Sequence, residues 1–89
     1  MAITVERKSE TSFTVSVKQR TTTTHVVTRL PEYWQKLTAG RVPEEALVQK
    51  SFEFLLEREP NTSILRRFSL PEIQSYFPEY ERTIRGMLE

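Results

Sequence analysis

The stretch that decides the fold is PEEALVQKSFEFLLERE, residues 43–59. Its apolar residues recur at the i, i+4, i+7 and i+8 spacing that lines one face of a helix, as shown by Val48, Phe52, Leu55 and Leu56. Pro43 suits the first helical position because it has no amide hydrogen to lose there, and Pro60 ends the segment. The sequence therefore predicts one long amphipathic helix over about residues 43–59, with its apolar face in the core.

The Pro-Glu pair that opens this segment occurs three more times, at 31–32, 71–72 and 78–79. Proline has a φ that suits the first helical turn, and a glutamate beside it faces the positive end of the helix dipole. Ser69 and Glu72 form the pattern of a capping box, and Gly40 is a candidate C-terminal cap. We therefore expect further helices over about residues 31–38, 70–77 and 78–88.

Towards the N-terminus the apolar period changes from helical to alternating. Phe13, Val15 and Val17 share one face of an extended segment, while the residues between them are polar. Residues 2–7 repeat this pattern more weakly, and residues 22–29 are dense in β-branched side chains. We expect strands over about residues 2–7, 12–18 and 22–29, arranged as an antiparallel hairpin or a three-stranded meander.

Together these segments predict an α+β fold in a single domain, residues 1–89, with a β part over 1–30 and a helical part over 31–89. A chain of 89 residues supports one hydrophobic core. The sequence leaves open the strand order, and whether residues 60–89 pack on their own chain or on a neighbouring molecule.

The residue inventory excludes several kinds of site. With no cysteine, no aspartate and a single histidine, His25, the chain cannot build a cysteine zinc site or a Ser-His-Asp triad. Its two glycines, Gly40 and Gly86, are too few for a phosphate-binding loop. We therefore expect no catalytic residue, metal, cofactor or small-molecule substrate. A small enzyme, the least favoured alternative, would need a concave pocket that holds a glutamate with a raised pKa.

The apolar segments are short. None approaches the ~18 residues that a membrane-spanning helix needs, and residues 1–10 lack the apolar region of an export signal. The expected location is therefore the cytoplasm, and we expect no membrane partner.

Residues 26–32 (VVTRLPE), followed by residues 43–57 (PEEALVQKSFEFLLE), give segment 25–59 the order strand, short helix, longer helix. This sequence pattern resembles that of the ribbon-helix-helix family of dimeric repressors and antitoxins. The resemblance implies a homodimer in which the strands of two chains pair into a ribbon that enters the DNA major groove. It also implies that alternate strand residues face the bases, namely Thr23, His25, Val27 and Arg29. Residues 12–18 of the same chain are also well placed to pair with residues 22–28. Such pairing would compete with pairing between the strands of two chains.

Charge is divided unevenly along the chain. Residues 1–42 carry seven Lys/Arg against three Glu, whereas residues 43–89 carry six against nine. A phosphate backbone would therefore be attracted to the first half. The candidate nucleic-acid-binding side chains are Lys18, Arg20, Thr23, His25 and Arg29. A DNA-binding regulator or antitoxin is accordingly the alternative function.

The function we favour is that of a small, non-enzymatic, bacterial-type interaction domain that binds a protein partner. On this interpretation the Thr and Lys/Arg side chains are solvated sheet surface and the helical stripe is core. Aromatic residues near the last two helix starts would contact the partner where they are exposed together, namely Tyr76, Phe77 and Tyr80. The partner is not identified by the sequence, and a homodimer remains an alternative.

Overall fold

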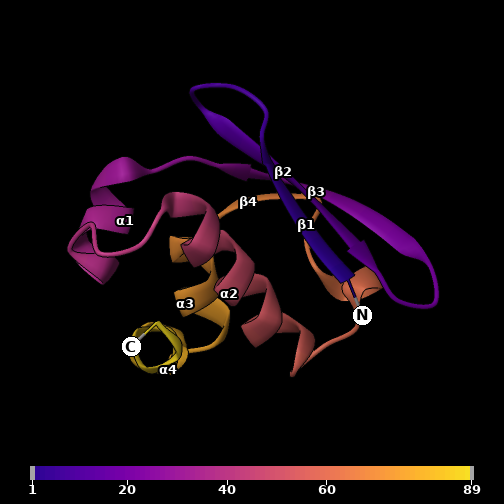
Figure 1. Cartoon of the computed structure of the whole chain (residues 1–89). Helices are drawn as coiled ribbons and strands as arrows, with labels where there is room; N and C mark the ends of the chain where they lie inside the picture. The colour runs from indigo at the N-terminus through magenta and orange to yellow at the C-terminus, as the bar shows by residue number, and fades with distance from the viewer. Residues whose placement is uncertain (1, 89) are drawn as a thin grey trace.

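A computed structural model describes residues 2–88 and has the expected α+β class, with strands followed by helices (Figure 1). The elements in chain order are β1 (Ala2–Arg7), β2 (Ser12–Lys18), β3 (Thr22–Thr28), α1 (Pro31–Thr38), α2 (Glu44–Leu56), the 3-10 turn η1 (Asn61–Ser63), β4 (Arg67–Ser69), α3 (Pro71–Tyr76) and α4 (Tyr80–Met87). The prediction of strands followed by three or four helices is confirmed, and the structure has four α-helices among residues 2–88.

The strands form one sheet in the order β1-β2-β3-β4. The first three make the predicted antiparallel meander, and β4 lies parallel to β3, with Val27 opposite Phe68. The sequence analysis did not predict β4. A three-residue strand with one inward apolar side chain has almost no alternation to detect, and its pairing depends on the crossover through α1 and α2.

The two faces of the sheet differ in chemistry. Phe13, Val15 and Val17 of β2 are buried beneath the helices, which all lie on one side of the sheet in Figure 1. The opposite face carries the Ser and Thr side chains that alternate with them, such as Thr14 and Ser16. The sheet therefore has one face packed on the core and one face left to solvent.

Helix α2 is the centre of the core. Its predicted apolar stripe is confirmed, because Val48, Phe52 and Leu55 are buried. The Phe52 ring lies 5.4 Å from the His25 ring and 5.8 Å from the Phe68 ring, measured between centroids. These contacts join α2 to β3 and β4. Residues 60–88 also pack on their own chain, since Tyr80 and Ile84 of α4 are buried.

Helix ends differ from the predicted bounds by a few residues. Pro43 and Pro78 lie just before α2 and α4 rather than inside them, whereas Pro31 and Pro71 are first helical residues as expected. The cap position assigned to Gly40 is taken by Ala39, whose φ is 54°. Gly40 follows with a φ of 72°, so two successive left-handed residues turn the chain after α1.

The C-terminal end of α2 comes at Leu56, although the prediction extended it to residue 59. The next residues form a turn in which the amides of Arg58 and Glu59 both donate to the Leu55 carbonyl, at 2.9 Å each. The bond from the Glu59 amide is an i to i−4 hydrogen bond, as in an α-helix. Glu59 therefore continues the helical spacing of the apolar stripe beyond Leu56.

Candidate functional site

The candidate nucleic-acid-binding residues lie at two ends of the sheet. Lys18 and Arg20 are exposed beside the turn between β2 and β3, and Arg29 follows the other end of β3. Thr23 lies opposite Val17 in the register and so faces the helices. The structure therefore brings Lys18 and Arg20 together but separates them from Arg29.

His25 is buried, whereas the sequence analysis placed it on the strand surface. The register sets it opposite Val15, on the face of β3 that the helices cover. Its Nδ1 lies 2.8 Å from the Leu65 carbonyl oxygen and its Nε2 lies 2.9 Å from Thr23 Oγ1. In a neutral ring, Nδ1–H then donates to Leu65, and Nε2 accepts from the Thr23 hydroxyl. The ring thus holds the segment after η1 against β3.

Arg29 takes part in an ion-pair cluster within the chain. Its Nε and Nη2 donate to both carboxylate oxygens of Glu44, and its Nη1 donates to the Glu10 carbonyl. The hydrogen bond to Glu44 is the main reason that the pKa of Arg29 is raised. Arg7 adds contacts to Glu44 at 3.5 Å and to Glu45 at 3.7 Å. The cluster joins the N-terminus of α2 to β1 and to the end of β3.

Strand β3 is paired with β2 along its whole length and with β4 over residues 26–28. A ribbon between two chains, as the resemblance to ribbon-helix-helix proteins implies, would need one edge of this strand to be free. Pairing of residues 26–28 with a second copy would therefore require β2 or β4 to leave the sheet.

The three candidate protein contacts lie at very different depths. The Tyr76 side chain is 67% exposed, whereas the Phe77 ring is half-buried with its centroid 5.9 Å from that of Phe54. Tyr80 is fully buried, its hydroxyl lies 2.6 Å from Ser51 Oγ, and burial raises its pKa. It lies inside because α4 turns the face of Tyr80 and Ile84 towards α2. Its side chain is therefore not available for a partner in this conformation.

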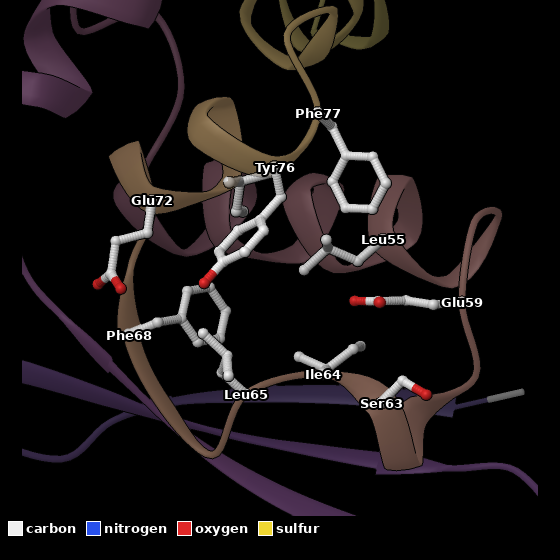
Figure 2. Close-up of a pocket in the computed structure, with 10 residues that line it drawn as sticks. Leu55, Glu59, Ser63, Ile64, Leu65, Phe68, Glu72, Tyr76 and Phe77 are labelled. Atoms are coloured by element: carbon white, nitrogen blue, oxygen red, sulfur yellow. The ribbon is translucent and has the colours of Figure 1, made fainter.

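Tyr76 and Phe77 line an apolar groove that the end of α2, the segment after η1, β4 and α3 enclose (Figure 2). The groove has a volume of about 170 Å³. Its apolar lining comes from Leu55, Ile64, Leu65, Phe68, Ile73, Tyr76 and Phe77. An engineered apolar cavity of about 150 Å³ holds one benzene molecule, so the groove has room for one aromatic ring or one leucine-sized side chain.

One carboxylate projects into this groove without a partner. Figure 2 shows the Glu59 side chain reaching between Leu55 and Ile64, and burial alone raises the pKa of its carboxyl group. Within residues 2–88 nothing forms a hydrogen bond or an ion pair with this carboxylate. The other acid of the groove, Glu72, instead accepts hydrogen bonds from the Ser69 amide at 2.7 Å and hydroxyl at 3.1 Å. The first of these is one of the two hydrogen bonds of the predicted capping box, although the cap position of α3 is Leu70. The groove therefore holds one free carboxylate.

Sequence reasoning missed Glu59, although a signal was present. Glu59 follows Leu55 by four residues and Phe52 by seven, so it continues the apolar stripe that predicts the core face of α2. An acid at the end of such a stripe lies at the margin of the core rather than in open solvent.

Neither a protein-family model nor a curated protein nor a solved structure matches this chain. In the part of the chain that the structure describes, no helix has the length and apolar character needed to cross a membrane. Nor does any group of three histidine or glutamate side chains among residues 2–88 come together as a metal site. The fold and the groove are accordingly the basis for the function proposed below.

The half-buried position of Glu59 leads to a prediction about stability. Because its pKa is raised in the folded protein, the group favours folding most below the unfolded value near 4.5, and this contribution is lost as the pH rises through the folded pKa. Glu59→Gln has a neutral side chain at every pH and so avoids the cost of a partly buried negative charge. We therefore expect the variant to be more stable than wild type at neutral pH. The two urea midpoints should converge as the pH falls below 4.5, measured at the lowest protein concentration that spectroscopy allows. A midpoint difference that does not change with pH would contradict the assignment.

Proposed function

We propose that this chain is a non-enzymatic protein-binding module, and that the groove is its docking site. The groove takes one apolar side chain of a partner, and the Glu59 carboxylate pairs with a lysine or arginine beside that side chain. The observation that carries this proposal is the unpaired Glu59 carboxylate inside a mostly apolar groove.

The size and rim of the groove support an apolar anchor. Binding energy in protein interfaces concentrates in a few side chains that fill well-formed pockets. Leu65 and Tyr76, 47% and 67% exposed, are two of three large hydrophobic side chains exposed within residues 2–88, and both line this groove. A partner side chain seated between them would cover apolar surface that is otherwise left in water.

The charge of the groove supports a cationic neighbour for that anchor. A partly desolvated carboxylate without a partner gains from a charge-assisted hydrogen bond, which is about twice as strong as a neutral one. Glu59 is such a group, since partial burial is the only cause that raises the pKa of its carboxyl group. An acidic partner segment would be repelled, so the groove selects for positive charge.

A pair of small probes tests this proposal. We expect 2-phenylethylammonium, a single ring with a cationic tail, to shift the amide resonances of residues 55–77 in a 1H-15N correlation spectrum recorded on monomeric protein, at the lowest workable protein concentration. Its neutral counterpart 2-phenylethanol should bind roughly tenfold more weakly, because it lacks the charge-assisted bond. Glu59→Gln should abolish this difference, and Tyr76→Ala should weaken both probes.

Lys18→Ala provides the control, because Lys18 is exposed and is not among the residues that line the groove. Its probe affinities should equal those of wild type. Equal affinities of the two probes for wild type, or shifts scattered over the sheet, would refute the proposed docking site.

The same carboxylate makes a small enzyme the second candidate function. A glutamate with a raised pKa in a concave site is what general acid-base catalysis requires, and Glu59 meets the condition set by the sequence analysis. The other carboxylate of the groove is engaged by Ser69, so no second free acid is at hand for a paired mechanism. Turnover of p-nitrophenyl esters or glycosides by wild type, lost in Glu59→Gln, would favour this candidate over a binding module.

A further inference from the structure

The surface around the groove contains the complement of the groove itself. Leu65 projects from its rim, and the next residue, Arg66, is exposed and has no charged partner within residues 2–88. Glu59 is the unpaired acid inside the groove. The groove and the two residues at its rim thus supply an apolar projection, an apolar hollow, a cation without a charged partner and an anion without one, within residues 2–88. A twofold-symmetric interface requires such self-complementarity, because the same patch serves on both subunits.

We propose that the partner of the groove is a second copy of this chain. In this dimer, Leu65 of each copy enters the groove of the other, and Arg66 forms an ion pair with the partner's Glu59. The inference rests on the proposed function and names its partner. The ion pair occurs twice, once on each side of the twofold axis.

The chain itself offers the ligand that the groove requires. Leu65 followed by Arg66 is an apolar side chain beside a cation, exposed on the surface. Of the three large exposed hydrophobic side chains within residues 2–88, Leu65 alone is followed directly by an arginine or lysine, since Pro31 follows Leu30 and Phe77 follows Tyr76. This combination favours a second copy over an unrelated partner.

The backbone of this projection is held in place before binding. The Leu65 carbonyl accepts a hydrogen bond from the buried His25 ring at 2.8 Å, and the Arg66 carbonyl accepts one from the Val26 amide at 2.7 Å. A segment that is already ordered loses less conformational entropy when it binds. The buried histidine thus acts as a positioning residue for the projection.

Charge reversal tests the pairing directly. Wild type should be a dimer by light scattering behind a sizing column at sub-millimolar protein. Glu59→Arg places two cations at each contact and Arg66→Glu places two anions there, so each variant should weaken the dimer by about 100-fold or more. An equimolar mixture of the two variants should recover a one-to-one dimer, because both of its contacts again join opposite charges. The double variant E59R/R66E should dimerise for the same reason.

Arg67→Glu is the matched control. Arg67 carries the same charge, but it lies opposite Val26 in the register, on the sheet face that the helices do not cover. This variant should dimerise like wild type. Far-UV circular dichroism and dispersed amide spectra establish that each variant is folded.

Three results would overturn the inference: a monomeric wild type at sub-millimolar protein, a single charge reversal that dimerises like wild type, or a mixture of folded variants that stays monomeric. Failure of the proposed function is distinguishable from these. Arg66→Glu has an open groove, and it should bind 2-phenylethylammonium in preference to 2-phenylethanol. If wild type is monomeric but this preference holds, the groove is still a docking site and only the second copy is excluded as its occupant.

Discussion

Replacing Phe52 with alanine is expected to destabilise the fold by about 3–5 kcal/mol, the usual range for removing a buried aromatic ring. Phe52 has 0% exposure and contacts the rings of both His25 and Phe68. The cavity would therefore open where α2 meets β3 and β4. Domains of this size are typically stable by about 5–15 kcal/mol, so the variant should lose a large part of the total.

Urea unfolding followed by the fluorescence of the single tryptophan, Trp34, measures this loss. Leu65→Ala is the control, because Leu65 is 47% exposed and its truncation should change stability by no more than about 0.5 kcal/mol at concentrations where the protein is monomeric. A loss of under about 1 kcal/mol in Phe52→Ala would show that this ring is not central to the core.

Asn61 is the second position where a large effect is expected. Its side chain is only 3% exposed, and Nδ2 donates to the carbonyl of Val17 at 3.2 Å and of Thr21 at 2.9 Å. Asn61→Ala leaves both carbonyls without this donor, at a cost of about 1–3 kcal/mol for each one that stays out of water. Asn61→Asp should cost more than the alanine variant, because a carboxylate has no hydrogen to donate and repels both oxygens.

The same unfolding experiment ranks these variants. Thr62→Ala serves as the control, since Thr62 is the exposed neighbour in the same turn and its loss should be nearly neutral. If Asn61→Asp proved as stable as wild type, the side chain would not be acting as the donor to these two carbonyls.

Asn61 and His25 together explain why the groove has a defined shape. Asn61 ties η1 to the turn between β2 and β3, and His25 ties the Leu65 carbonyl to β3. The segment between them forms one wall of the groove. Polar contacts buried at the edge of the core thus position an apolar docking surface.

The sequence by itself determined the elements whose two faces differ strongly. On β2, Phe13, Val15 and Val17 alternate with Ser, Thr and Lys, so the buried face follows from the residues alone. The stripe of α2 is equally one-sided. The Pro-Glu pairs marked the helix starts because capping depends only on neighbouring residues.

The two faces of β3 carry side chains of similar polarity. Only the tertiary structure determines which of them is buried. One face carries Thr23, His25 and Val27, while the other carries Thr24 and Val26 among further threonines. Pairing with β2 decided that the histidine would be buried, because register aligns it with Val15. The local pattern offered no preference that could have shown this.

The formation of β4 and the enclosure of the Glu59 side chain likewise depend on contacts between segments far apart in the chain. β4 exists because the crossover through α1 and α2 returns the chain beside β3. That return also brings Leu65 and Phe68 against the end of α2, and only then does the Glu59 carboxylate lie in a groove. Local periodicity sets which face of an element is apolar, whereas the enclosure of a site depends on which distant surface covers that face.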